Sequence, residues 1–338
     1  MTAPHTGLRL LYIAPTDDAE LAHNRLRRRA LERLGASLLH VDPAHAGWLE
    51  RLVRRDLADR LEAAIAQHQP DVVMVADEDT LPADVADQLR AARPAKWVQL
   101  LGESVDSIER TAHAAMSYDF VFVGSTAAVQ GLDRHGVKHA HYLPVGCDPS
   151  VHKPLRARGP FRANVVFAGQ ATPRRERYLT ELVEFGLALW GPGWRKTGLR
   201  DYCRGELPST EDFVRAYAGA TVAVNVHRDD PDSANGDGAG VNRRTFEIAA
   251  IGAPQVVDAR ADLPPLFEDG TEVLVYETPD QLKGQVKRAI QEDKYRDRLA
   301  AAARQRALTR HTYMHRLREL LRVLFPLGAF PGAPETRP

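Results

Sequence analysis

The chain of 338 residues contains few cysteines and no long apolar run. Its only two cysteines, Cys147 and Cys203, lie far apart, and neither forms a CxxC pattern or has a histidine nearby. Such sparse cysteine use is typical of proteins in a reducing compartment. We therefore expect a reduced, cytoplasmic, enzyme-like chain.

The sequence also lacks an excess of charge of either sign. Lys and Arg total 45 residues, and Asp and Glu total 45 as well. No net field would therefore attract the chain to nucleic acid or to an acidic membrane. No apolar stretch approaches the roughly 20 residues of a membrane span, and the early apolar run is too short and strand-like for a signal peptide. We expect neither nucleic-acid binding nor a transmembrane segment.

What the sequence does contain is a regular alternation of short apolar runs and helical patterns. In the first half, six strands are predicted from the runs LRLLYIAP, ASLLHVD, DVVMVADE, KWVQLLGE, DFVFVGS and AHYLPVG. Continuous Val, Ile and Leu runs separated by helices indicate a parallel sheet that is buried on both faces. Residues 1–150 are therefore predicted to form a Rossmann-like, acceptor-side domain.

Residues 147–163 show neither the helical nor the strand periodicity of apolar residues, and they carry three prolines. We therefore interpret them as an interdomain linker. The alternation then restarts with five predicted strands, in NVVFAGQ, LALWGPGW, TVAVNVHRD, APQVVDA and TEVLVYE. A wholly helical pattern follows from Gln281 to about Leu324. A second Rossmann-like domain is predicted over 160–310 and a final helix over 311–328. We expect an α/β protein of two doubly wound domains that face a cleft.

Ligands of such sheets bind at the carboxyl ends of the strands, and the loops there are polar. In QATPRRER, Thr172 is a good helix N-cap and Pro173 suits the first helical position. Arg174, Arg175 and Arg177 then crowd the first turn, where cations oppose the helix dipole. A bound anion would explain these arginines, and so would a solvated basic surface.

The turn GPGW follows the next predicted strand. The backbone of Gly191 and Gly193 could contact a flat base edge, with Trp190 or Trp194 as a stacking face. Either tryptophan could equally be a core side chain.

The long loop DPDSANGDGAGVNRR brings the backbone amides of Gly238 to Asn242 to the start of a helix, which predicts an anion site. Its glycines do not form a dinucleotide fingerprint, because that motif needs a tight turn from strand to helix and about ten residues intervene here. An EF-hand is excluded as well, because Asn235 stands where the calcium loop needs glycine.

Asn242 is expected to cap the helix that Arg243 and Arg244 begin, and Glu247 lies one turn inside that helix. A carboxylate only accepts hydrogen bonds, and two vicinal hydroxyls can share its oxygens. Phosphates at the helix start, with a ribose diol about one turn further in, match a nucleoside diphosphate. We interpret this stretch as a nucleotide-diphosphate clamp.

These residues, in this order, resemble the GT-B glycosyltransferases of group 1, and most closely the CgeB-like branch, whose members resemble spore maturation proteins. The likeness spans roughly residues 150–330 and rests on VVFAGQATPRRER, LWGPGW, VNVHRDD, NRRTFEIAAIGAPQVVDARADLPPLFEDGTEVLVY and HTYMHRLRELL. The resemblance implies that Glu247 contacts the donor ribose. It also implies that the final helix crosses back to the N-terminal domain.

The predicted donor-binding residues are Gly169, Arg174, Arg177, Trp190, Gly191, Gly193, Gly238, Gly240, Asn242, Arg243, Arg244 and Glu247. Because arginines and helix amides would neutralise the diphosphate, no metal is expected, despite Asp230 and Asp232. The nucleotide-diphosphate sugar is a co-substrate, and no other cofactor is predicted.

Many retaining relatives carry a second glutamate eight positions before the ribose glutamate, and Ala239 stands there in this chain. The retaining mechanism is therefore not carried over, and both stereochemical outcomes stay open. An inverting enzyme needs a carboxylate or a histidine to take the proton of the acceptor hydroxyl. Candidate carboxylates after the N-terminal strands are Asp17, Asp18, Asp77 to Asp79, Glu103 and Asp106.

Glu103 is the first choice among these bases, because it ends a buried strand and Gly102 frees the backbone before it. It could also merely cap the following helix. Asp18 is a further catalytic candidate. His227, whose position matches the family, is also a catalytic candidate and is assigned to the donor phosphate or sugar.

The predicted function is sugar transfer from a nucleotide-diphosphate sugar to a hydroxyl of a small-molecule, glycan or protein acceptor. The fold could also serve a nucleotide-sugar epimerase, or a nucleotide-sugar-binding protein without transferase activity. A phosphoacceptor signalling module is disfavoured, because Gly124, Ser125 and Thr126 occupy the place of the lysine that it needs after strand five.

Overall fold

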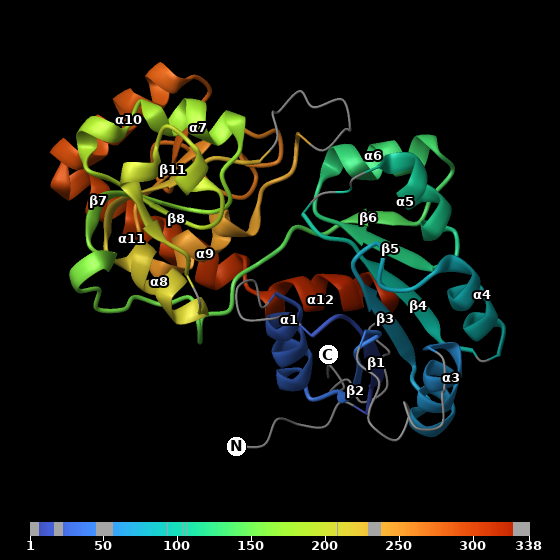
Figure 1. Cartoon of the computed structure of the whole chain (residues 1–338). Coiled ribbons are helices and arrows are strands. Elements are labelled where there is room, and N and C mark those ends of the chain that lie inside the picture. Colours follow the sequence, from blue (N-terminus) through green and yellow to red (C-terminus); the bar gives the residue numbers. More distant parts are fainter. Residues whose placement is uncertain are drawn as a thin grey trace. The chain divides into compact units, whose positions relative to one another are not determined.

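The chain folds into two compact α/β units (Figure 1). The computed structural model describes residues 7–16, 23–44, 57–92, 94–103, 105, 107–207, 209–228 and 238–326. The N-terminal unit contains the described residues up to Pro144 together with those from Tyr313 onward. The C-terminal unit contains the described residues of Val145–Thr312.

The N-terminal unit is built on a parallel sheet of six strands. These strands are β1 (Arg9–Ile13), β2 (Ser37–Val41), β3 (Val72–Ala76), β4 (Lys96–Leu100), β5 (Phe120–Val123) and β6 (Ala140–Tyr142). Their order is β2-β1-β3-β4-β5-β6, so the direction of winding reverses between β1 and β3. All six strands were predicted from the apolar runs, and the doubly wound fold class is confirmed.

Helices cover this sheet and separate its strands. They are α1 (His23–Arg33), α3 (Leu57–His68), α4 (Ala83–Ala92), α5 (Ile108–Ala115) and α6 (Thr126–Arg134). Every residue of β3 is buried, as the uninterrupted run VVMVA requires of a central parallel strand. The core formed with these helices includes Leu11, Val73, Trp97 and Val121.

The C-terminal unit has a second parallel sheet of six strands. These strands are β7 (Ala163–Ala168), β8 (Leu187–Trp190), β9 (Cys203–Gly205), β10 (Ala220–Asn225), β11 (Gln255–Asp258) and β12 (Leu274–Tyr276). In the order β9-β8-β7-β10-β11-β12 the winding reverses between β7 and β10. This is the strand order of dinucleotide-binding Rossmann folds.

The sequence did not predict β9, which has only three residues and no apolar run. It lies at the edge of the sheet and pairs with β8 alone. The α-helices of this unit are α7 (Pro173–Thr180), α8 (Thr210–Ala218), α9 (Arg243–Ile251), α10 (Pro279–Gln291) and α11 (Asp293–Arg310). Its short 3-10 helices are η1 (Gly159–Phe161), η2 (Val183–Phe185), η3 (Trp194–Lys196) and η4 (Arg200–Tyr202).

The last helix, α12 (Tyr313–Leu324), belongs to the N-terminal unit although it ends the described chain. It packs against α1, beside which it is drawn in red in Figure 1. Its buried side chains include Tyr313, Leu317 and Leu320, which lie on one face at helical spacing. The expected return of the final helix to the N-terminal domain is confirmed.

The segment 147–163, expected to be a linker, is packed into the C-terminal unit. The backbone N–H of Cys147 donates to the carbonyl oxygen of His311 at 3.0 Å, and Cys147 is fully buried. The side chain of His152 is also buried, with 1% of its surface exposed. In the described part of the chain, no helix is both long and apolar enough to cross a membrane.

Candidate functional site

The described residues that directly follow β7, β8 and β10 lie at the carboxyl end of the C-terminal sheet, beside the point where its winding reverses. Gly191 has a φ of 117°, and a Cβ there would lie 2.6 Å from the carbonyl oxygen of Gly169. Gly193 has a φ of 90° and lies against Ala171. Glycine at these two positions therefore allows the backbones after β7 and β8 to touch, which is how the predicted Gly169, Gly191 and Gly193 come together.

Trp190 and Trp194 are core side chains. Trp190 is 5% exposed and stacks on Phe161, with ring centroids 5.4 Å apart. Trp194 is fully buried, and its indole N–H donates to the carbonyl oxygen of Gly169 at 2.7 Å. The structure thus favours the core alternative over base stacking for both rings, because their faces pack inside the unit.

The arginines at the start of α7 divide into two that are buried and one that is exposed. Thr172 caps the helix by accepting the N–H of Arg175, as predicted. Arg174 and Arg175 turn back over the end of β10 and donate to the carbonyl oxygens of His227 and Val226, each at 3.0 Å. Arg177 is exposed and lies over the ring of Tyr178. Arg174 and Arg175 therefore brace the strand end, a structural role that the sequence analysis did not assign to them.

Arg175 stays strongly electropositive in a confined place. Burial, and then the nearby guanidinium of Arg244, lower the pKa of Arg175 to about 9. The group thus remains charged at neutral pH while it lies beside other cations. An anion bound here would relieve that repulsion.

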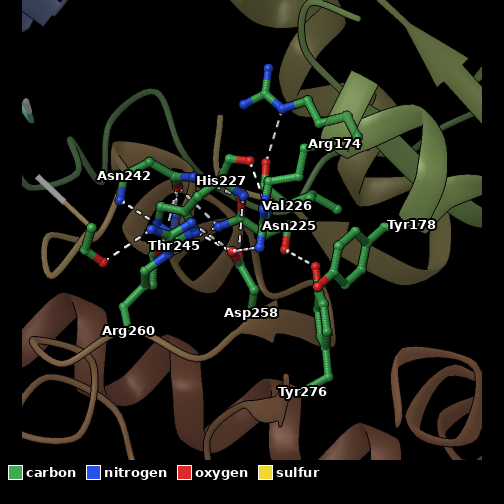
Figure 2. A network of polar contacts seen from close by, with 12 residues as sticks. Arg174, Tyr178, Asn225, Val226, His227, Asn242, Thr245, Asp258, Arg260 and Tyr276 are labelled. Atoms are coloured by element: carbon green, nitrogen blue, oxygen red, sulfur yellow. Dashed lines mark hydrogen bonds and ion pairs between the residues drawn. The ribbon is translucent and has the colours of Figure 1, made fainter. Parts of the chain in front are cut away.

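A buried carboxylate, Asp258 at the end of β11, organises the centre of the site (Figure 2). Its Oδ2 accepts from Arg174 at 3.0 Å and from Arg260 at 2.8 Å. Burial alone would raise the pKa of Asp258, but attraction by His227, Arg260 and Arg174 outweighs it and holds the pKa well below the usual range. Asp258 is therefore a permanently charged anchor.

His227 is a brace between this anchor and the helix α9. The backbone N–H of Asn242 donates to its Nε2 at 2.9 Å, so Nε2 is the acceptor nitrogen. Its Nδ1 lies 2.6 Å from Oδ1 of Asp258 and therefore carries the proton. Both ring nitrogens of His227 are engaged in this way. The geometry therefore disfavours the predicted contact of His227 with a donor phosphate. It also disfavours a role of His227 as catalytic base.

A network of side-chain amides fixes the start of α9, as Figure 2 shows. The side-chain N–H of Asn225 donates to Oδ1 of Asn242 at 3.0 Å and to Oε1 of Gln255 at 3.1 Å. Oδ1 of Asn242 also accepts the backbone N–H of Thr245, so Asn242 is the N-cap that its sequence position predicted. All four residues are buried, so the first turn of the helix is held rigidly at the sheet edge.

Arg244 is a cation that forms no pair with this framework. Its guanidinium lies against Gly169, where a Cβ would approach Nη2 to 3.0 Å. Within the described residues it makes no hydrogen bond or ion pair, and its Nε is shielded from solvent. A shielded guanidinium nitrogen without a partner is costly, and an anion bound here would supply the missing partner.

The backbone before α9 is positioned by the same framework. Gly238 and Gly240 are buried, and the carbonyl oxygen of Gly238 accepts from Arg260 at 3.0 Å. Asp258 and Arg260 thus tie the end of β11 to the residues that precede the helix. The sequence analysis missed both, although Asp258 stands at the carboxyl end of a predicted strand, where the rule for ligand loops would have found it.

Glu247 is buried one turn into α9, with Arg243 on the same helix face. Nε of Arg243 lies 3.8 Å from Oε1 of Glu247. On its other side, Nε2 of His152 lies 3.7 Å from the same oxygen. Nδ1 of His152 accepts the backbone N–H of Asp148 at 3.1 Å, so the neutral ring carries its proton on Nε2 and directs it toward Glu247. His152 had no signal in the sequence, because it lies in the irregular segment.

The predicted catalytic carboxylates of the N-terminal unit are only partly within the described residues. Asp17, Asp18 and Asp106 lie outside them. Glu103 follows β4 and is half-buried, and a Cβ at Gly124 would lie 3.2 Å from its Cα. Ser107 caps α5 by accepting the N–H of Arg110, so the cap of that helix does not need Glu103.

Asp77 to Asp79 also follow a strand, and Asp77 is held in a polar cluster. It adopts a left-handed backbone with a φ of 65°. Its Oδ2 accepts from the side chain of Asn24 at 3.0 Å, and its Oδ1 lies 3.6 Å from Nε2 of His23. The described residues contain no group of three or more His, Cys, Asp or Glu side chains that could hold a metal ion, while Asp230 and Asp232 lie outside them.

The fold of the whole chain is that of the GT-B glycosyltransferases. Sucrose-phosphate synthase from Thermosynechococcus elongatus is 16% identical, and the match covers 94% of this chain and 99% of that one with a TM-score of 0.71. HepE from Anabaena, solved in complex with UDP and glucose, is 12% identical over 94% of this chain and 100% of that one, with a TM-score of 0.67. At such low identity these likenesses concern the fold.

A family model described as glycosyl transferase-like matches residues 174–322. The matched region includes the arginines of α7 and the whole of α9. No curated protein matches the chain. Residues 174–322 therefore match a glycosyl transferase-like family model within a GT-B fold, and the narrower CgeB-like resemblance stays a prediction.

Proposed function

We propose that the protein is a glycosyltransferase that moves a sugar from a nucleotide-diphosphate sugar to an acceptor hydroxyl. The observation that carries this proposal is the unneutralised, partly shielded guanidinium of Arg244 beside Gly169. It lies at the N-terminal end of α9, at the switch point of a sheet whose order suits nucleotides. Structures of HepE are described as complexes with UDP and with UDP-glucose, which supports a nucleotide-sugar donor.

In this proposal the diphosphate binds at the start of α9. Arg244 and Arg243 provide charge, and the N–H groups of the first turn add the positive end of the helix dipole. Glu247, one turn further along, accepts hydrogen bonds from the ribose hydroxyls, and Arg243 and His152 hold its carboxylate.

Transfer forms a bond between the acceptor oxygen and the anomeric carbon, while the bond from that carbon to the diphosphate breaks. The leaving diphosphate gains negative charge, which Arg244 and the helix amides would stabilise. Glu103 is our proposed base for the acceptor proton. Because cations and amides provide the neutralisation, we propose that transfer does not require a divalent metal ion.

A thermal-shift screen of UDP, GDP, dTDP, CDP and their sugars identifies the donor. A ligand at a hundred times its dissociation constant should stabilise the fold by about 2.7 kcal/mol. Arg244→Gln should weaken the best nucleotide about tenfold or more but leave its nucleoside unaffected, because it removes a charge-assisted contact to phosphate alone. Arg298→Gln, an exposed change on α11, is the matched control.

A labelled donor sugar then distinguishes the activities that share this fold. Label on an acceptor supports transfer, whereas a changed sugar that stays on the nucleotide indicates an epimerase. Loss of activity in EDTA with recovery in manganese would contradict metal-independent transfer.

A further inference from the structure

A cavity of the C-terminal unit lies at the amino end of β10, whereas the candidate site lies at the carboxyl end of that strand. Its volume is about 740 Å³. It is lined by Ala220 at the start of β10, Gly219 after α8 and Gly252 after α9. Asn225, at the other end of β10, belongs to the candidate site, so the two regions are separated by the length of the strand.

The charged side chains around this cavity are mostly cations. Arg296 is neutralised, because it pairs with Asp293 at 2.6 Å and lies 3.5 Å from Asp297. The other lining arginines are Arg156, Arg162 and Arg304. The side chains of these three form no hydrogen bond or ion pair with the described part of the chain. The Nε of Arg304 is also shielded from solvent.

Helix dipoles account for only part of this charge. Both α8 and α9 end at the cavity, and each helix C-terminus carries about half a negative charge, roughly one in total. The side chain of Arg304 lies close to the C-terminus of α9, because a Cβ on its C-cap Gly252 would lie 3.2 Å from Cδ of Arg304. A cation is favoured at such a helix C-terminus. Asp297, which also lines the cavity, offsets one further positive charge, so the three unpaired arginines leave about one positive charge unbalanced.

We propose that this cavity binds a small molecule that carries a phosphate monoester. Such a group has a charge of about −1.5 to −2 at neutral pH, and the three arginines without an ion-pair partner in the described residues can pair with its oxygens. Guanidinium groups donate parallel hydrogen bonds that fit phosphate oxygens. The volume is also in the range of small-molecule sites, about 300–1,000 Å³. This site does not depend on the proposed glycosyltransferase activity, because it shares no residue with the candidate donor site.

The test is isothermal titration of the full-length protein with ribose 5-phosphate, with inorganic phosphate and with ribose as the uncharged control. The ester should bind more tightly than inorganic phosphate, and ribose should not bind. Arg162→Gln and Arg304→Gln should each weaken the ester about tenfold or more, because each removes a charge-assisted hydrogen bond. Arg298→Gln, on α11 but outside the cavity, should leave its affinity unchanged.

The ester could also bind in the candidate donor site. The variant Arg244→Gln distinguishes binding in that site from binding in the cavity. Unchanged ester affinity in Arg244→Gln supports the cavity, whereas binding lost in that variant and kept in Arg162→Gln overturns the proposal. If Arg298→Gln weakened ester binding as much as the cavity variants do, the effect would be one of general charge and the proposal would be overturned. Absence of ester binding to the wild type would overturn it as well. Arg156→Gln and Arg162→Gln change exposed side chains, so they provide the readout even if Arg304→Gln unfolds the protein.

Discussion

The carboxyl ends of the two sheets hold the same chemical group, an aspartate with a lowered pKa, in two different settings. In the C-terminal unit the side chain of Asp258 is 2% exposed and pairs with His227, Arg174 and Arg260. In the N-terminal unit the side chain of Asp77 is 35% exposed and contacts His23 and Asn24. Burial works to raise the pKa of Asp77, but the hydrogen bond from His23 and attraction by Arg27 lower it to about 2.

This difference separates a rigid framework from a more open polar cluster. Around Asp258, every partner also fixes a backbone segment: Arg174 binds the end of β10, His227 the start of α9, and Arg260 the residue Gly238. This framework forms no hydrogen bond or ion pair with the side chain of Arg244 in the described residues. In the Asp77 cluster the side chains of Asp77 and His23 are partly exposed, so they can exchange contacts with water.

The largest expected effect is therefore on stability. Asp258→Asn should lower the free energy of unfolding by about 3–5 kcal/mol, because it leaves two buried arginines without their carboxylate. Asp77→Asn should cost only about 1 kcal/mol, since its side chain is partly solvated. Urea unfolding of both variants measures the difference, and equal losses would contradict the contrast between the two sheet ends.

A large kinetic effect is expected from the N-terminal unit. Glu103→Gln should reduce turnover about a hundredfold or more if this carboxylate takes the acceptor proton, while donor affinity stays unchanged. Steady-state kinetics with the donor found by screening measures both quantities. Near-normal turnover would remove Glu103 as the base and return attention to Asp17, Asp18 and Asp106.

The smallest effect concerns pH. Burial lowers the pKa of His152 below its usual 6.5, although Glu247 and Asp148 oppose the shift. The unfolded chain then binds the proton more readily, so the free energy of unfolding should fall as the pH drops below about 6.5. His152→Gln should remove a few tenths to about 1 kcal/mol of this dependence. A pH dependence of unfolding as steep in the variant as in the wild type would exclude His152 as its source.

Much of the fold was predictable, because buried parallel strands leave continuous apolar runs. The three-residue strand β9 was missed, since a short edge strand needs little apolar surface. At the site, sequence position identified Thr172 and Asn242 as caps, because capping depends on local spacing. Sequence position could not distinguish Arg174, which pairs with Asp258, from Arg244, which does not. The pairing depends on residues that are distant in the chain.

We propose that α9 binds a nucleoside diphosphate, with Glu247 on the ribose. The most direct measurement is a thermodynamic cycle by calorimetry that compares the best ribonucleotide with its 2′-deoxy form in the wild type and in Glu247→Ala, with Glu277→Ala as an exposed control. We predict that Glu247→Ala weakens the ribonucleotide by about 1.5–3 kcal/mol, the value of a charge-assisted hydrogen bond, and weakens the deoxy form much less. The preference for ribose should then largely disappear. Equal affinity of Glu247→Ala and the wild type for the ribonucleotide, or an unchanged ribose preference, would contradict the account.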